Sequence, residues 1–229
     1  VISRSAWAVM VWNVDMVGMT LGVTVAVKYG YDSDGLSGLQ VIDISNPAAP
    51  VIVGSINTPG FAQGVTVSGN YAYVADARSG LQVINITYPQ EEPSIVGAVD
   101  TLGKAWNVTV SGNYAYVADG TLGLQVIDIS NRAAPVIIGS IGTPGFAAGV
   151  TVSGNYAFVA ADTSGLQVID ISNPAAPVIV GSIDTPGAAG GVTVSGNYAY
   201  VADRYSGLQI IGISDLADTD SDLIVDGDD

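Results

Sequence analysis

The sequence predicts an all-β protein, a five-bladed β-propeller of four-stranded antiparallel blades. The first observation is a repeat, because the tripeptide Gly-Leu-Gln returns at intervals of about 42 residues. Its five copies begin at Gly38, Gly80, Gly123, Gly165 and Gly207. The second observation is that each unit contains four short runs rich in β-branched and aromatic residues, bounded by turn residues. Four strands in a unit of this length are typical of a propeller blade.

The second unit shows the predicted strands most clearly. They cover residues 65–68, 71–76, 81–87 and 94–99. In the third run Leu81 and Val83 point to one side, and Ile84 and Ile86 point to the other. A sheet that is apolar on both sides must be covered on both sides. We therefore expect each sheet to pack between two others.

The two ends of the chain are complementary. The fifth unit has strand-like runs at 192–195, 198–203 and 208–214 but no fourth run, while residues 9–14 near the N-terminus align with 51–56, a fourth strand. We expect the N-terminal strand to complete the last blade and close the ring. The alternative is that it completes the last blade of a neighbouring molecule, which would give a head-to-tail filament.

The predicted domain is a propeller over residues 1–214, followed by an acidic tail at 215–229. Its repeats cover approximately 23–56, 64–99, 107–141, 149–183 and 191–214, with the N-terminal strand at 8–14.

Composition excludes several classes of function. The chain has 21 acidic and 6 basic residues, a net charge of -15, so nucleic acid and anionic membrane surfaces would be repelled. Because Cys and His are absent, there is no thiol or imidazole for catalysis or metal binding. A bound metal would have to be a hard cation with oxygen ligands. Asn13 and Asp15 interrupt the apolar N-terminal stretch, so we expect no membrane insertion.

Residues 165–181, Gly-Leu-Gln-Val-Ile-Asp-Ile-Ser-Asn-Pro-Ala-Ala-Pro-Val-Ile-Val-Gly, resemble the LVIVD repeat. Together with the Tyr-Ala-Tyr-Val-Ala-Asp strand, the resemblance extends over about residues 23–214. It implies a propeller and an extracellular or cell-surface location, because LVIVD repeats occur mostly in surface or secreted proteins of bacteria and archaea. No common enzymatic activity is attached to the family, so it implies no catalytic residues.

The tail at 218–229 is similar to the calcium-binding type 3 repeat of thrombospondins. That resemblance implies calcium ligands at five aspartates: Asp218, Asp220, Asp222, Asp226 and Asp229. The pattern has Gly at the sixth position of the loop, where this chain has Leu223. We therefore expect calcium as the cofactor of the tail, with a solvated, metal-free end as the alternative.

Two further sets of residues repeat with the blades. One is an aspartate at the end of each second strand: Asp34, Asp76, Asp119, Asp162 and Asp203. We interpret these as caps of the turn that follows, and a cation-binding carboxylate ring is the alternative. The other set is a pair of tyrosines in the second strand, which we assign to packing in preference to sugar stacking.

Trp106 and Lys104 depart from the repeat, in the connection that leads into the third blade. Loops at that place line one face of a propeller, so these two side chains are the predicted ligand contacts. Filling of local space is the alternative role for Trp106.

These observations predict a non-enzymatic structural or interaction module of a secreted or cell-surface protein, a scaffold or an adhesin. Its expected partners are other protein subunits, including further copies joined head to tail by strand donation. A propeller that binds glycans or another small ligand is the alternative, and it requires departures from the repeat to cluster on one face. A carboxylate-dependent hydrolase or lyase is a third hypothesis, but no unequal pair of carboxylates stands out.

Overall fold

A computed structural model describes residues 13–16 and 18–214 of the chain. In this part nineteen strands form five antiparallel sheets, one for each repeat. The first blade consists of β1 (Gly22–Ala26), β2 (Tyr29–Ser33), β3 (Leu39–Asp43) and β4 (Val51–Ile56). The second consists of β5 (Gly64–Ser68), β6 (Tyr71–Ala75), β7 (Leu81–Asn85) and β8 (Ser94–Val99). The third consists of β9 (Asn107–Ser111), β10 (Tyr114–Ala118), β11 (Leu124–Asp128) and β12 (Val136–Ile141). The fourth consists of β13 (Gly149–Ser153), β14 (Tyr156–Ala160), β15 (Leu166–Asp170) and β16 (Val178–Ile183). The fifth consists of β17 (Gly191–Ser195), β18 (Tyr198–Ala202) and β19 (Leu208–Gly212), with a short 3-10 helix, η1 (Arg204–Ser206), between the last two.

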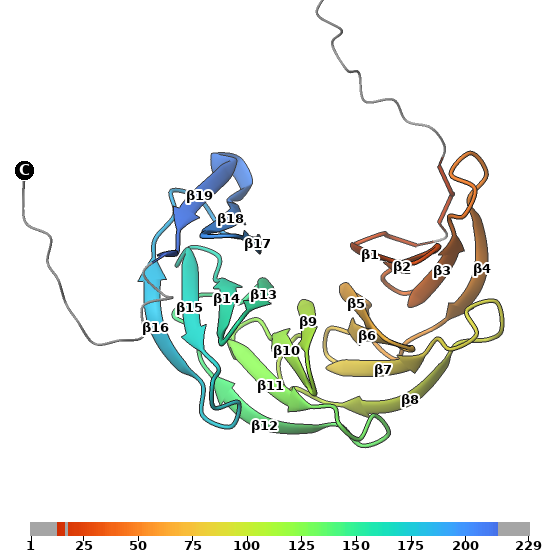
Figure 1. The fold of residues 1–229 in the computed structure, drawn as a ribbon, viewed down its shortest axis with the longest axis horizontal. Coiled ribbons are helices and arrows are strands. Elements are labelled where there is room, and N and C mark those ends of the chain that lie inside the picture. The colour runs from red at the N-terminus through yellow and green to blue at the C-terminus, as the bar shows by residue number, and fades with distance from the viewer. Residues whose placement is uncertain (1–12, 17, 215–229) are drawn as a thin grey trace, which may run out of the picture.

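Within each blade the strands pair in chain order, from an inner first strand to an outer fourth strand (Figure 1). The inner strands β1, β5, β9, β13 and β17 pack on one another in sequence around the centre of the arc. Glycine at the start of most of these strands permits the close approach, since a Cβ on Gly149 would lie 2.9 Å from the Cα of Gly191. The predicted propeller architecture is thus confirmed, with strand bounds that differ from the predicted ones by a few residues at most.

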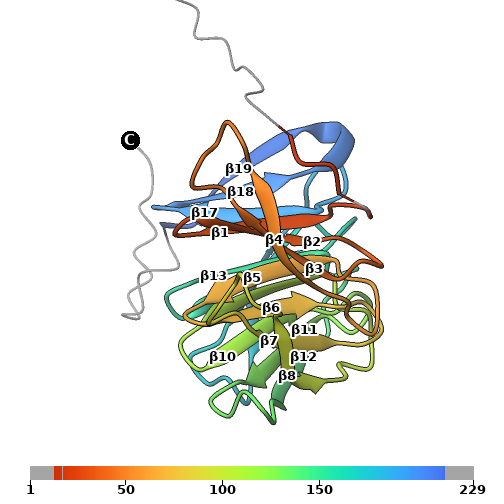
Figure 2. The same ribbon diagram turned by 90° about the vertical axis from the view of Figure 1, so that its right-hand side faces the viewer.

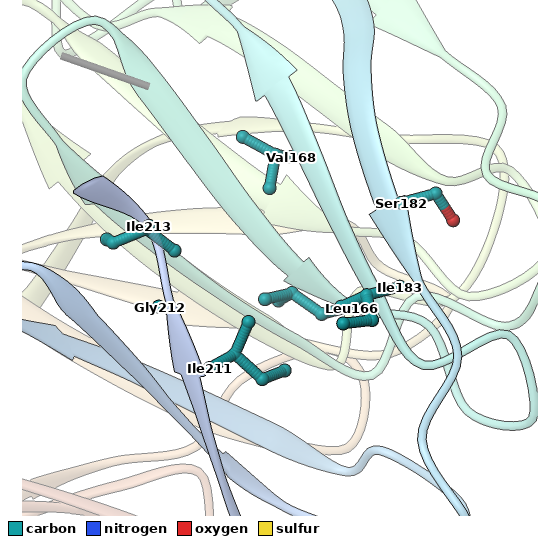
Figure 3. Close-up of a pocket in the computed structure, with 7 residues that line it drawn as sticks. All are labelled: Leu166, Val168, Ser182, Ile183, Ile211, Gly212 and Ile213. Atoms are coloured by element: carbon teal, nitrogen blue, oxygen red, sulfur yellow. The ribbon is translucent and has the colours of Figure 1, made fainter. Parts of the chain in front are cut away.

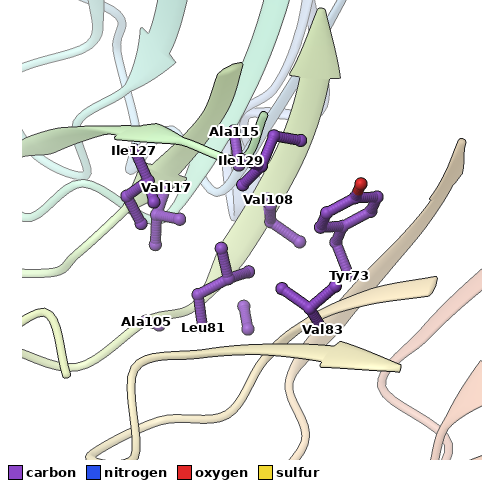
Figure 4. Packing of buried hydrophobic residues seen from close by; sticks show 10 residues of the cluster. Tyr73, Leu81, Val83, Ala105, Val108, Ala115, Val117, Ile127 and Ile129 are labelled. Carbon is purple, nitrogen blue, oxygen red and sulfur yellow. The ribbon is translucent and has the colours of Figure 1, made fainter. Parts of the chain in front are cut away.

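The core lies between the blades, as the two-sided pattern requires. Between the second and third blades Leu81 and Val83 pack against Val108, Ile127 and Ile129 (Figure 4). Each of these side chains is buried. The opposite face of the second blade packs on the first blade, through a separate cluster that includes Ile84 and Ile86. The prediction that each sheet is covered on both sides is therefore confirmed for the interior blades.

The five blades form an open arc, with a gap between the first and the last (Figure 1). In the view turned by 90°, β1 lies in front of β17 (Figure 2), and the two strands do not pack on each other as consecutive inner strands do. The last sheet has three strands in the described part of the chain. Of the predicted N-terminal strand, residues 8–12 lie outside the described residues, and residues 13 and 14 carry no strand structure. Ring closure by that strand therefore stays a prediction. No helix in residues 13–16 and 18–214 is long and apolar enough to cross a membrane.

Candidate ligand-binding site

One side of the arc is built from two kinds of loop. The first is the turn between the second and third strands of a blade, and the second is the connection that leads into the next blade. A short backbone bridge joins them: Gly35 of the first turn and Ala62 of the following connection exchange N–H···O hydrogen bonds of 3.2 and 3.0 Å. The same bridge recurs between Ala77 and Ala105, between Gly120 and Ala147, and between Asp162 and Ala189. We call this side the loop face.

In four of the five blades a buried aspartate also holds the connection that leads into the blade. The Asp76 carboxylate accepts hydrogen bonds from the Thr58 hydroxyl at 2.6 Å and from the Gly60 N–H at 2.8 Å. Asp203 holds Thr185 and Gly187 in the same way. These carboxylates therefore bind the connection that leads into their own blade, 18 residues earlier in the chain at the threonine, and not the turn that follows them. The structural role expected for these aspartates is confirmed, but the expected hydrogen-bond partners were wrong.

The fourth blade lacks this carboxylate. Ala161 occupies the position of Asp76, and Asp162 follows one residue later, at the left-handed position of the turn with a φ of 50°. The Thr143 hydroxyl accordingly donates to the Gly145 carbonyl at 2.7 Å. The proposed five-fold aspartate ring with Asp162 as a member is therefore wrong, and four blades contain the buried carboxylate.

Burial raises the pKa of two of these aspartates. It raises the pKa of Asp119 to about 6, against the opposing effect of hydrogen bonds from the Thr101 hydroxyl and the Gly103 amide. Burial also raises the pKa of Asp76, for which Thr58 and Gly60 act in the opposite direction. These carboxyl groups are enclosed by the protein and engaged with it, which suits the joining of blades better than the binding of a solvent cation.

The repeated tyrosines pack in the core. Tyr73 and Tyr116 are buried between blades, where Phe158 takes the equivalent place in the fourth blade. The Arg132 guanidinium lies over the ring of Tyr71, 4.8 Å from its centroid. The assignment of these tyrosines to packing is confirmed for the interior blades.

The blades differ from one another on the loop face. Four positions in each blade change side-chain type around the arc, two in the turn and two in the connection. The turn positions are Gly35, Ala77, Gly120, Asp162 and Arg204, and Leu36, Arg78, Thr121, Thr163 and Tyr205. The connection positions are Met19, Phe61, Lys104, Phe146 and Ala188, and Leu21, Gln63, Trp106, Ala148 and Gly190. On the opposite side, the turn between the first two strands keeps Gly-Asn in the last four blades, whereas the loop between the third and fourth strands varies, most of all at residues 87–93 of the second blade.

The joint between the second and third blades contains a hollow on the loop face. Its volume is about 510 Å³, and Phe61, Arg78, Lys104 and Trp106 are among its lining residues. Elsewhere a phenylalanine of the connection covers the preceding turn, since a Cβ on Gly35 would lie 2.9 Å from the Phe61 ring and one on Gly120 would lie 3.0 Å from the Phe146 ring. Lys104 replaces that phenylalanine at this joint. A flexible cationic side chain therefore stands where the neighbouring joints have an aromatic plug.

Trp106 forms the boundary between this hollow and the centre of the arc. The residue is 37% exposed, and its ring meets the Phe146 ring edge to face, with the centroids 5.4 Å apart. Trp106 also lines a hollow of about 330 Å³ among the inner strands, together with Gln63 and Asn107. Packing on Phe146 therefore holds the indole in place while Trp106 remains partly accessible to a ligand.

The charge at this hollow is opposite to that of the molecule. The chain has 6 basic residues and a net charge of -15, yet Arg78 and Lys104 both line this hollow, and no carboxylate does. Neither side chain forms an ion pair within residues 13–16 and 18–214, whereas Lys28 and Arg204 each have a carboxylate partner. Two free cations beside an exposed indole suit an anionic ligand with a ring face.

The two predicted ligand contacts, Lys104 and Trp106, are therefore brought to one hollow. Arg78 was not predicted. Comparison of the turns position by position would have found it, because it is the only basic residue among the five at that place.

A second hollow, of about 200 Å³, lies between the fourth and fifth blades (Figure 3). Leu166, Val168, Ile211 and Ile213 give it an apolar lining. In the two preceding interfaces an isoleucine of the outer strand, Ile137 or Ile179, packs in the corresponding cluster. The described part of the fifth blade has no outer strand, so this hollow is incomplete packing and not a polar binding site.

The predicted calcium ligands, Asp218 to Asp229, lie outside the described residues. Within the described ranges, no group of three or more acidic side chains is placed to hold a metal ion.

With the repeated blades and their loop face established, the chain can be compared with known proteins. The LVIVD repeat family model matches residues 17–58, 59–101, 102–143, 144–185 and 186–226. The fold is thus a propeller of repeated four-stranded blades, and the chain belongs to the LVIVD repeat family. The fifth match overlaps the segment in which the calcium-type tail was predicted. No curated protein matches the chain.

Solved structures support the fold. The computationally designed protein Ika8 is similar with a TM-score of 0.68 at 11% identity, over 85% of this chain and 58% of that chain. The computationally designed protein Ika4 is similar with a TM-score of 0.59 at 12% identity, over 70% of this chain and 97% of that chain. This chain therefore spans little more than half of Ika8.

Proposed function

We propose that this chain is a non-enzymatic interaction module that binds an acidic carbohydrate through its loop face. The hollow at Arg78, Lys104 and Trp106 carries the proposal, since it gathers an exposed indole and two cations that form no ion pair with the described residues, on a strongly acidic molecule. Arginine pairs with a carboxylate through two parallel hydrogen bonds, and the flat face of a tryptophan ring covers the apolar face of a sugar. The variation of the loop face between blades supports the same function, because it places differences where a ligand would meet them.

A catalytic role has less support. The aspartates that recur with the blades are buried, and Asp76, Asp119 and Asp203 hold threonine hydroxyls of the connections. A hydrolase or lyase would need a solvent-facing pair of carboxyl groups with unequal environments. The setting we propose is extracellular or at the cell surface, as the membership of the LVIVD family suggests.

The test is isothermal titration calorimetry of the full chain with two probes, an oligogalacturonate and a neutral malto-oligosaccharide of equal length. We expect the acidic probe to bind and the neutral one to bind at least about 10-fold more weakly, because a charge-assisted hydrogen bond contributes about 1.5–3 kcal/mol. Arg78→Ala and Lys104→Ala should each weaken the acidic probe at least about 10-fold. Lys28→Ala is the matched control, since it removes a cation from the opposite side of the arc.

Equal affinity for the two probes would contradict the acidic specificity. Unchanged binding by Arg78→Ala, Lys104→Ala and Trp106→Ala would move the site elsewhere and refute the proposal. Binding should also weaken with added salt, since exposed charges are screened.

Calcium binding by the tail is a separate proposal, supported by the spacing of Asp218, Asp220, Asp222, Asp226 and Asp229. Calcium titrated into the full chain should release or absorb heat, and an Asp218→Ala/Asp220→Ala variant should not respond. An identical response from that variant would exclude the tail as the site.

A further inference from the structure

Each interface between blades has two different halves. One blade contributes its trailing face, exemplified by Leu81 and Val83 in β7, and the next blade contributes its leading face, exemplified by Val108 in β9. This pair of faces is repeated at each of the four interfaces within the arc. Among residues 13–16 and 18–214, one leading face and one trailing face therefore have no partner blade.

The trailing face of the fifth blade is uncovered. Leu208 and Ile210 are 61% and 60% exposed in β19. Their counterparts in the preceding blades are buried, with Leu81, Leu124 and Leu166 fully inaccessible to solvent. The same side chains that form the core elsewhere are thus presented to solvent at this end of the arc.

The leading face of the first blade is uncovered along its inner strand β1, although Ile42, the counterpart of Ile84 on this face, is buried. Val23 and Val25 are 66% and 62% exposed in β1, whereas Val65, at the position of Val23 in the second blade, is buried against the first blade. This face differs at one polar position, because Asp32 stands where Val74 lies in the second blade. Asp32 is already buried within its own blade and accepts a hydrogen bond of 3.0 Å from Thr20, so it adds no exposed charge to the face.

The two faces do not meet within the described chain. β17 and β1 do not pack as successive inner strands do, and the arc is open between them (Figure 1). Ika8, which is similar over 85% of this chain, is a longer chain, since the match covers 58% of it.

We propose that the trailing face of the fifth blade binds the leading face of the first blade of a second copy, blade against blade. A second copy is the occupant because the contact would repeat the interfaces within the arc. Leu208 and Ile210 are of the same type as the trailing residues of the other blades, and those residues already pack against a leading face. The contact is heterologous, since different surfaces of the two copies meet, so assembly continues until a ring closes or a filament grows. It buries side chains of two sheets face to face, which distinguishes it from donation of a strand to a sheet edge.

Two variants that each block one face provide the test. Leu208→Asp places a carboxylate on the trailing face, and Val23→Asp places one on the leading face. In sedimentation velocity of the full chain, the unmodified protein should exceed the 23.2 kDa of one copy increasingly with concentration. Each variant alone should remain a single copy. An equal mixture should form a 1:1 dimer of twice that mass and no larger species, because only one intact pair of faces remains.

Controls separate this result from misfolding and from other modes of assembly. Both variants should keep the melting temperature of the unmodified protein, since the altered side chains are exposed in the single copy. Tyr88→Asp changes an exposed aromatic residue on neither end face and should assemble like the unmodified protein. A single copy at every concentration, with Leu208→Asp strongly destabilised, would show that the ring closes within one chain and would overturn the proposal. Undiminished assembly of Leu208→Asp would overturn it in favour of strand donation.

Discussion

Protonation of the buried aspartate of the third blade should make the protein more stable in mild acid. The Asp119 side chain is inaccessible to solvent, and burial raises its pKa from 3.8 to about 6. Because the native pKa is the higher one, ionisation opposes folding above pH 6, and stability rises as the pH falls from 6 towards 3.8. The shift corresponds to about 3 kcal/mol when the group is ionised in both states. About 1 kcal/mol of this is regained between about pH 7.5 and about pH 5.

The perturbation is Asp119→Asn, which keeps the shape of the side chain and can still bond to the Thr101 hydroxyl, 2.6 Å away in the native protein. Urea unfolding at the two pH values gives the free energy of unfolding in each. The gain in stability on acidification should be smaller in Asp119→Asn than in the unmodified protein by about 1 kcal/mol.

The matched control is Asp43→Asn. Hydrogen bonds from Ser45 hold the pKa of Asp43 below its usual value, and Asn85 occupies the equivalent place in the second blade. The stability that depends on ionised Asp43 is lost only as the pH falls below 3.8, outside the tested window. Asp43→Asn should therefore keep the full gain. An equal gain in Asp119→Asn and in the unmodified protein would refute the reasoning.

Three further substitutions test the packing by urea unfolding. Leu124→Ala should lower the free energy of unfolding by about 2–5 kcal/mol, because the leucine is fully buried. Leu208→Ala, at the same position of the last blade, should lower it by less than about 1 kcal/mol in the single copy. Equal losses would contradict the exposure of the last blade. Gly80→Ala should destabilise the protein more than Gly69→Ala. Both glycines have a positive φ, but only at Gly80 would the new Cβ collide with the backbone, at the carbonyl oxygen of Val99. Similar losses of stability would mean that the backbone around Gly80 shifts to make room. Arg204→Ala should change stability by less than about 1 kcal/mol, since its ion pair is largely exposed, and a larger loss would assign that pair a part in holding the last two blades together.

The repeat made most of the fold predictable. Four strands in each unit follow from runs that recur with the same turns, and the apolar residues on both sides of the third strand predict packing of blade on blade. The partner of Asp76 could not be predicted in this way, because Thr58 lies 18 residues earlier and approaches only through the bend of the connection. Asp162 was misplaced because residue type was matched instead of position. Four residues before Gly165, where Asp76 stands relative to Gly80, the sequence has Ala161.

The candidate site was predictable in part. Lys104 and Trp106 stand out because each breaks a pattern kept by neighbouring units, and the loop location follows from the blade topology. Their position beside Arg78 could not be predicted from the repeat, because it depends on how loops of two blades pack in space. Arg78 comes from a turn of the second blade, and only the backbone bridge between Ala77 and Ala105 brings that turn to the connection of the third blade.

The missing carboxylate at Ala161 has a mechanical consequence. Pulled from its two ends, the arc transmits force through the connections in series, so the weakest joint limits the load that the whole can bear. The connection into the fourth blade lacks the threonine–aspartate bond of 2.6 Å that fastens the connections into the second and third. Under tension we expect the molecule to part there first, into one piece of three blades and another of two.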